Sequence, residues 1–178
     1  MNWIKSLFLP KESSSDILTI RNFLDVSECD EILRLLENYN FIGAHQFENG
    51  RHNMEMFVED QKILSVILKK MNLLRITGTK KVLEYHEPFE FYKYNKGDYI
   101  LPHEDSSIYF NSGIQSNFTA IIYLNDNYLG GQTFFNQLKR KIKPQKGTLL
   151  LFKHNLLHEA QVVKNGTKYI YRSNWFIN

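Results

Sequence analysis

The sequence contains a single cysteine, Cys29, and this scarcity already excludes several kinds of protein. One thiol cannot form an intramolecular disulfide, and it rules out a zinc site built from cysteines. Because disulfides persist in oxidising compartments, a lone cysteine favours a reducing, cytoplasmic setting. Cys29 falls in a helical pattern of apolar residues, so we expect it to be a small buried core residue.

Long apolar runs, internal repeats and low-complexity tracts are also missing. No stretch approaches the roughly 18–20 apolar residues that span a membrane, and residues 1–16 lack the pattern of a signal peptide. The Lys and Arg residues are scattered and the formal net charge is only +3, so there is no concentrated basic surface. We therefore expect neither a membrane nor a nucleic acid as a partner.

The sequence does contain two amphipathic helical segments followed by many short strands. Helical spacing runs from Ser27 to about Asn38, with Ser27 or Asp25 as the N-cap, and again over about 63–74. The segment 41–58 is mixed, with a turn at Gly50. The expected strands are 17–23, 81–85, 89–94, 99–102, 118–124, 132–135, 140–142, 148–152, 158–162 and 167–177. An aromatic share of 14% also favours β structure, and the order of elements predicts an α+β fold whose helices pack on one sheet.

One histidine lies beside a carboxylate in an arrangement that suits a metal. In an extended segment, residues two apart point to the same side, so His103 and Asp105 can approach one ion while Glu104 points away. Two histidines and one carboxylate leave three positions open, as in non-haem Fe(II) oxygenases, whereas catalytic zinc is the alternative for the same ligands. A His and an Asp that only hydrogen-bond each other would give the same short pattern. The other histidines are His45, His52, His86, His154 and His158.

The segment around this pair resembles a known family. Residues 91–105 (FYKYNKGDYILPHED) are similar to the metal-binding region of prolyl 4-hydroxylase-like, 2-oxoglutarate-dependent oxygenases. Further blocks of that family follow in order, at residues 119–125, 130–135, 144–152, 157–160, 166–169 and 172. The resemblance spans roughly residues 91–176, half the chain, and ordered blocks are more specific than any single motif.

The resemblance implies a fold and a third ligand. It implies a double-stranded β-helix, the jelly-roll or cupin-like fold, over about residues 81–178. Helical support and a lid over about 17–80 complete a single domain of residues 1–178. His158, ten residues before Lys168 in the block Leu-His-Glu, matches the distal ligand, and His154 becomes a residue behind the ligands or in a loop. The remaining histidines, which have no matching role, are assigned to surface or lid positions.

The resemblance also implies a site for 2-oxoglutarate. Lys168 would pair with the C5 carboxylate, since a buried charge needs a partner. Tyr123 and Tyr94 are expected to donate hydrogen bonds to the bound 2-oxoglutarate, and Thr119 is a further candidate. Arg172 shares a strand face with Lys168, so it would share this anion or neutralise a substrate carboxylate nearer the mouth.

The activity implied is that of an Fe(II)- and 2-oxoglutarate-dependent dioxygenase that hydroxylates an unactivated C–H bond. Related halogenases lack the carboxylate ligand, so Asp105 favours hydroxylation, and desaturation or another C–H oxidation is left as an alternative. Fe(II) is the expected cofactor, 2-oxoglutarate and O2 are co-substrates, and ascorbate is an optional reductant. The substrate implied is a peptidyl proline. A free amino acid or another small metabolite is an alternative because the lid segment 42–58 matches nothing in the family. A non-catalytic cupin-like binding domain is a more distant alternative, and we expect a monomer or homodimer.

Overall fold

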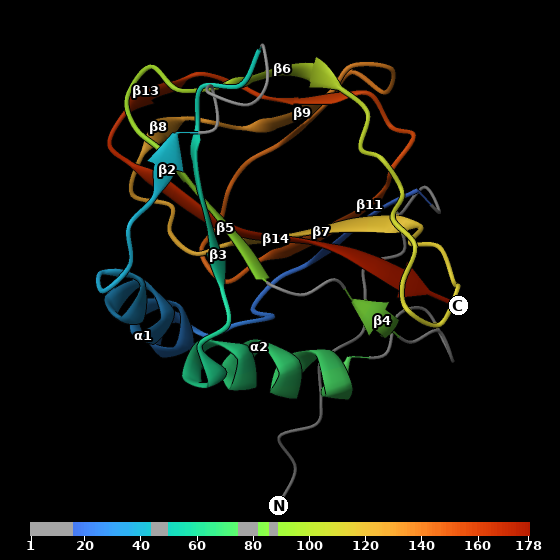
Figure 1. Cartoon of the computed structure of the whole chain (residues 1–178). Helices are drawn as coiled ribbons and strands as arrows, with labels where there is room; N and C mark the ends of the chain where they lie inside the picture. The colour runs from blue at the N-terminus through green and yellow to red at the C-terminus, as the bar shows by residue number, and fades with distance from the viewer. Residues whose placement is uncertain (1–15, 44–49, 75–81, 86–88) are drawn as a thin grey trace, which may run out of the picture.

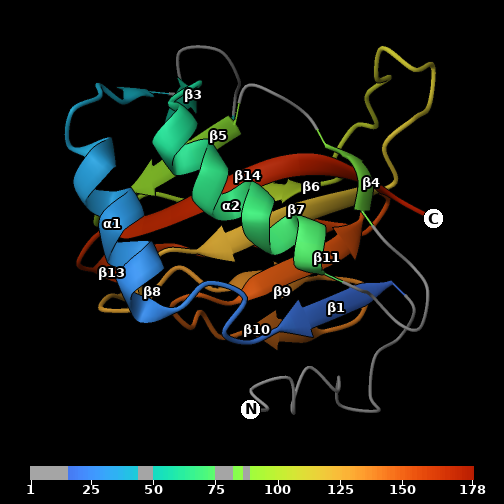
Figure 2. The ribbon, with the colours of Figure 1, turned by 90° about the horizontal axis from the view of Figure 1, so that it is seen from below.

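The computed structural model describes residues 16–43, 50–74, 82–85 and 89–178. Two sheets face each other, and two helices cover the outer face of the larger sheet (Figure 1). Seen from the helical side, one helix crosses the middle of that sheet and the other lies toward one end of it (Figure 2). The expected packing of helices on one sheet is therefore confirmed. His45 and His86, assigned to the surface or the lid, lie outside the described residues.

The larger sheet is built around the long strand β14 (Lys168–Ile177). Its direct neighbours are β7 (Phe118–Tyr123), β5 (Phe89–Tyr94) and β4 (Val82–Tyr85). Farther strands are β11 (Leu149–Lys153) and β1 (Ile17–Ile20) beyond β7, and β3 (Met54–Val58) and β2 (Ile42–Gly43) beyond β5. All these pairings are antiparallel, so strands distant in sequence are held in fixed register.

The smaller sheet has four strands and faces β14 across the interior. Its order is β10 (Arg140–Ile142), β9 (Thr133–Phe135), β12 (His158–Ala160) and β6 (Ile100–His103). A separate two-stranded pair joins β8 (Leu129–Gly130) to β13 (Val163–Asn165). This small sheet matters for the site because it carries two of the candidate metal ligands.

Each helix begins at an aspartate whose side chain satisfies free backbone donors. In α1 (Val26–Leu36), the Asp25 carboxylate accepts from the Glu28 N–H, and the Glu28 carboxylate accepts from the Asp25 N–H. In α2 (Gln61–Leu73), Asp60 accepts from the first turn in the same way. Asp25 was one of the two expected N-caps. These caps fix where the helices start and hence which apolar faces meet the sheet.

Successive side chains of a strand point to opposite faces of the sheet, and this divides the interior into two cores. On β7, Ala120 and Ile122 point to the helices, whereas Ile121 and Tyr123 point to the smaller sheet. The same rule applies to β14, where Trp175 lies in the helical core. Since both faces are covered, the central strands are buried almost throughout. The face toward the smaller sheet is the one that lines the cleft described below.

The strands predicted from the sequence correspond closely to those observed. Each one expected from residue 81 onward has a counterpart within a few residues. The mixed segment 41–58 contains β2 and β3. Strands β8 and β13, of two and three residues, were not predicted.

Gly147 joins the turn before β11 to the start of α1. Its φ is +76°, and a Cβ at this position would lie 2.1 Å from the carbonyl oxygen of Leu24. We expect Gly147→Ala to lower the free energy of unfolding by more than about 2 kcal/mol, because backbone strain and a backbone clash add together. Gly97→Ala is the matched control, since Gly97 has a φ of +94° with no atom within 4 Å of its added Cβ. Chemical denaturation would contradict this account if the two variants lost equal stability.

No helix among the described residues is long and apolar enough to cross a membrane. Cys29 is a fully buried residue of α1, as its helical pattern predicted. The cytoplasmic setting, the single-domain organisation and the oligomeric state stay predictions.

Candidate active site

Three of the predicted ligands meet at the open end of the smaller sheet. His103 ends β6 and His158 begins β12, and these two residues are direct partners in the antiparallel register. Asp105 follows β6 by two residues. One potential ligand atom from each of the three side chains lies within 4.8 Å of the others. Strand pairing thus brings together two histidines 55 positions apart, and with Asp105 they form a cluster that can hold one metal ion.

The two histidines present the same nitrogen to the centre of the cluster. The Nδ1 atom of His103 lies 2.8 Å from the Leu101 carbonyl oxygen, and that of His158 lies 2.9 Å from the Leu156 carbonyl oxygen. A carbonyl only accepts, so each Nδ1 carries a proton, and in the neutral ring Nε2 then has a free lone pair. The Nε2 atoms lie 3.8 Å and 3.6 Å from the Asp105 carboxylate oxygens. Fixing the tautomer through the other ring nitrogen is typical of metal-ligating histidines.

The charge state of the cluster also suits a cation. Burial by itself raises the pKa of Asp105, but the nearby charge of Arg172 and the other neighbours outweigh burial and lower that pKa to about 2. Burial lowers the pKa of His158 to about 4. At neutral pH the cluster therefore offers one carboxylate and a neutral imidazole at His158, which are the protonation states a divalent metal requires.

Arg172 is tied to the cluster itself. Its Nη2 atom lies 3.0 Å from Asp105 Oδ1, and its Nη1 atom lies 3.3 Å from Glu90 Oε2. Tyr92 also donates to Glu90, at 2.9 Å. The guanidinium of Arg51 lies 5.1 Å from the centre of the Tyr92 ring. This series of charged and aromatic groups forms one wall of the cleft.

Thr119 and His154 lie directly behind Asp105. The Thr119 hydroxyl is 2.6 Å from Asp105 Oδ2 and 2.9 Å from His154 Nδ1. The other ring nitrogen of His154 is 2.9 Å from the hydroxyl of Ser116. His154 therefore lies behind the ligands, as expected, and both of its nitrogens contact protein hydroxyls.

Lys168 lies deep in the same cleft and is 1% exposed. Its ammonium donates to the Gly131 carbonyl oxygen at 2.9 Å and lies 4.5 Å from the centre of the Tyr94 ring. Tyr123 is also adjacent, and its hydroxyl is 2.7 Å from that of Thr133. No carboxylate among the described residues forms an ion pair with Lys168. Burial without such a partner lowers the pKa of Lys168 to about 7, and an anion bound beside it would supply the missing counter-charge.

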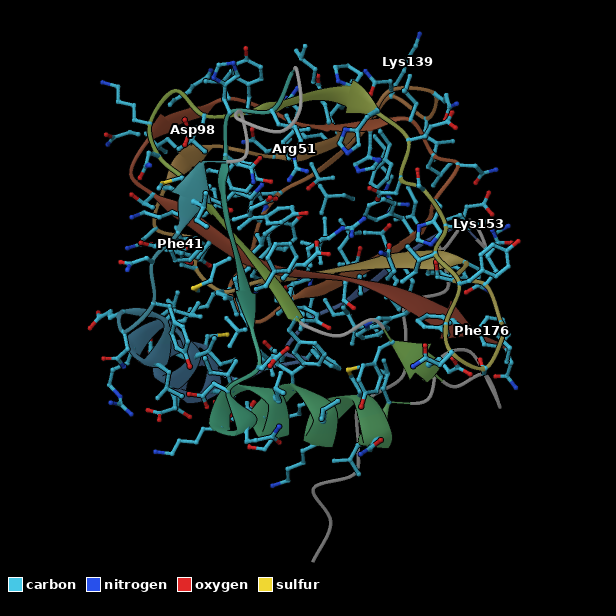
Figure 3. The ribbon with its side chains drawn as sticks, in the orientation of Figure 1. Phe41, Arg51, Asp98, Lys139, Lys153 and Phe176 are labelled. Carbon is cyan, nitrogen blue, oxygen red and sulfur yellow. The ribbon has the colours of Figure 1, made fainter. Side chains whose placement is uncertain are left out.

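A single cleft of about 550 Å³ connects the three-residue cluster with Lys168. Lys168 and Arg172 line it from the inner face of β14, and Tyr94 lines it from β5. Arg51 lies among the side chains between the two sheets, on the side of β3 (Figure 3). Seven of the eight predicted site residues line this cleft. Tyr123 instead contacts it through Thr133 and Lys168.

Sequence reasoning missed two further groups in the wall, namely Glu90 and Tyr92. The signal for both was present, because Glu90 and Tyr92 alternate with Phe91 on the same strand as Tyr94 and must face the same way. Arg51 comes from the segment 41–58, where no pattern indicated a direction.

Comparison with known proteins places these features in a family. Residues 89–176 match the family model described as 2OG-Fe(II) oxygenase superfamily. A curated protein of Acanthamoeba polyphaga mimivirus, named "Putative prolyl 4-hydroxylase", is 24% identical over 183 residues, which cover 88% of this chain and 72% of that protein.

Two solved structures extend the likeness to the fold. The viral collagen prolyl hydroxylase of Paramecium Bursaria Chlorella virus-1, solved as a 2-oxoglutarate (2OG) complex, gives a TM-score of 0.66 at 24% identity and covers 92% of this chain and 96% of its own. A Trichoplax adhaerens prolyl hydroxylase, solved with a hypoxia inducible factor peptide fragment, gives 0.67 at 20% identity, covering 92% and 84%. The double-stranded β-helix expected from the sequence is confirmed by these structures.

Proposed function

This chain belongs to the 2OG-Fe(II) oxygenase superfamily, and we propose that it hydroxylates a prolyl residue of a peptide or protein. It is a 2-oxoglutarate-dependent dioxygenase that uses Fe(II) as cofactor and O2 as second co-substrate. The observation that carries the proposal is one cleft holding both a His-Asp-His cluster and a buried lysine without a carboxylate partner among the described residues.

In this proposal His103, Asp105 and His158 hold the iron. Their donor set fits, since two imidazole nitrogens and one carboxylate leave open positions for a co-substrate and O2. When bound, Fe(II) couples the oxidative decarboxylation of 2-oxoglutarate to insertion of an oxygen atom into a C–H bond. The carbonyls of Leu101 and Leu156 keep both imidazole rings aimed at the same point.

Lys168 would bind the C5 carboxylate of 2-oxoglutarate, with Tyr94 and Tyr123 beside it. Support comes from the buried ammonium, whose contacts are one backbone carbonyl and two aromatic rings. An incoming carboxylate would supply the missing counter-charge at a point that water hardly reaches. Because Lys168 and the cluster line one cleft, a single bound molecule would contact both.

The mouth of the cleft favours a substrate that extends beyond it. Phe57 and Leu101 line the cleft, and they are 55% and 53% exposed. Exposed apolar side chains at a rim can contact the residues that flank a target proline. A free amino acid would fit inside the cleft and leave both side chains uncovered. The names of the similar proteins point to the same substrate class.

The test is incubation with Fe(II), 2-oxoglutarate and a set of proline-rich peptides, with matched peptides that carry alanine in place of proline. We expect succinate formation together with a mass gain of one oxygen atom and hydroxyproline after hydrolysis, in the proline peptides alone. Free L-proline and other free amino acids form a parallel set. Hydroxylation of a free amino acid without any peptide turnover would replace the peptide substrate by the small-molecule alternative.

The pKa of Lys168 predicts how 2-oxoglutarate binding depends on pH. Without a ligand the ammonium loses its proton above about pH 7, whereas a bound carboxylate keeps it charged. Binding above pH 7 therefore takes up a proton, and the affinity falls as pH rises, approaching tenfold per pH unit. Titrations of metal-loaded protein between about pH 6.5 and 8.5 measure this, in buffers of different ionisation enthalpy. The Lys168→Arg variant is the control because arginine stays charged. A wild-type affinity for 2-oxoglutarate that does not change with pH would contradict the prediction.

A further inference from the structure

Both carboxylate oxygens of Asp105 are held by neighbouring side chains. Arg172 holds Oδ1 at 3.0 Å, and the Thr119 hydroxyl holds Oδ2 at 2.6 Å. The side chain of Asp105 is only 10% exposed, so few waters compete for these positions. Its backbone is tied as well, since the Asp105 N–H donates to the His154 carbonyl oxygen at 3.0 Å. The rotamer of this carboxylate is therefore determined by protein contacts before any ion arrives.

A chain of hydrogen bonds lies behind Asp105, and the donor and acceptor of each bond can be assigned from the two ends of this chain. The carboxylate can only accept, so the Thr119 hydroxyl donates to it and must accept from the Nδ1–H of His154. At the other end, the Ile108 N–H donates to the Ser116 hydroxyl at 3.0 Å, which leaves the Ser116 proton for His154 Nε2. A neutral His154 protonated at Nδ1 satisfies every member of this chain.

Burial makes these hydrogen bonds specific. Thr119, Ser116 and His154 are 1%, 3% and 6% exposed, so water cannot readily replace a lost partner. The hydroxyl of Thr119 has one proton, and it donates this proton in its hydrogen bond to Asp105. That leaves Thr119 no proton to donate to a carboxylate of 2-oxoglutarate, the role suggested by the resemblance. The geometry places Thr119 behind the metal ligand rather than beside the co-substrate.

We propose that Thr119 and His154 are positioning residues that hold the Asp105 carboxylate in its metal-binding orientation. The inference rests on the proposed role of Asp105 as a metal ligand. Thr119 acts on Asp105 directly, and His154 acts through Thr119 by supplying the hydrogen bond that orients its hydroxyl. Partners behind a metal ligand typically change metal affinity by about 10–100-fold when they are removed. Metal affinity, rather than 2-oxoglutarate affinity, is therefore the property these residues control.

The first test compares Thr119→Val with Thr119→Ser by titrating Mn(II) into protein without 2-oxoglutarate. Valine keeps the shape but removes the hydroxyl, so Thr119→Val should bind Mn(II) about 10–100-fold more weakly. Serine keeps the hydroxyl and should restore affinity to within a few-fold of wild type. At saturating Mn(II), both variants should bind 2-oxoglutarate as wild type does. Unchanged Mn(II) affinity in Thr119→Val, or weakened 2-oxoglutarate binding at saturating Mn(II), would overturn the inference.

The second test separates the His154 side chain from general packing. In His154→Asn the amide N–H takes the place of Nδ1–H and can still donate to Thr119, whereas His154→Leu supplies no donor. We expect His154→Leu to weaken Mn(II) binding by about tenfold and His154→Asn to recover most of that loss. Equal affinities in the two variants would contradict a positioning role. If wild-type protein itself failed to bind Mn(II), the proposed function would fail instead, so the two failures are distinguishable.

Discussion

Replacing Lys168 by methionine should weaken 2-oxoglutarate binding by roughly 100-fold or more, because truncating one partner of a buried charge pair costs about 2–5 kcal/mol. Methionine has a similar length but no charge, so the C5 carboxylate would enter a nearly dry pocket without its cation. The cleft, the metal cluster and the aromatic walls around position 168 would stay in place. Titration of 2-oxoglutarate into Mn(II)-loaded protein measures the loss.

The same substitution should leave the cofactor-free protein within about 1 kcal/mol of wild-type stability. The lost hydrogen bond from Lys168 to the Gly131 carbonyl costs about 1 kcal/mol, and removal of a desolvated ammonium offsets it. Lys164→Met is the matched control, since Lys164 is exposed on β13, the strand that precedes β14 in the chain. Full 2-oxoglutarate affinity in Lys168→Met would show that Lys168 does not bind the co-substrate.

Replacing Asp105 by alanine should abolish both metal binding and succinate formation. The substitution removes the only carboxylate of the cluster and leaves Arg172, a buried cation, facing the two histidines. Two imidazoles without a carboxylate, next to the guanidinium of Arg172, form a poor site for a divalent cation. Isothermal titration with Mn(II) and a succinate assay with Fe(II) report the two losses separately.

Glu104→Ala is the control for Asp105→Ala, because it removes the adjacent carboxylate, which is exposed and outside the three-residue cluster. It should bind Mn(II) as tightly as wild type. If loss of Asp105 prevents folding, Asp105→Asn keeps the shape and a hydrogen-bond acceptor for Thr119, and it should still lose metal affinity. Turnover in a folded Asp105 variant would exclude this residue as a ligand.

Much of the three-residue cluster could be predicted from local rules in the sequence. An extended His103-Glu104-Asp105 segment puts the histidine and the aspartate on one side, which the structure bears out geometrically. The third ligand could not be chosen by spacing alone, since two histidines precede the last strand. Register decides between them, because His158 pairs directly with His103 whereas His154 lies four residues earlier, in a turn. At the level of sequence, only the resemblance to the family could indicate His158.

The contacts of the charged side chains that line the cleft beside this cluster could not be predicted in the same way. Arg172 was expected to meet an anion, but nothing in its strand indicated that this anion would be Asp105. Glu90 lies on β5, 82 residues away, and its contact with Arg172 depends on how β5 and β14 pair. Such contacts come from tertiary register, which a single sequence specifies only weakly at polar positions.

The central claim is that one cleft binds a metal through His103, Asp105 and His158 and binds 2-oxoglutarate through Lys168. An anaerobic titration of 2-oxoglutarate into Fe(II)-loaded wild-type protein, repeated without metal and with His158→Ala and Lys168→Met, tests it most directly. The account predicts one 2-oxoglutarate per loaded chain and binding weakened by roughly 100-fold or more in each of the other three cases. Equal affinity with and without Fe(II), and in both variants, would contradict it.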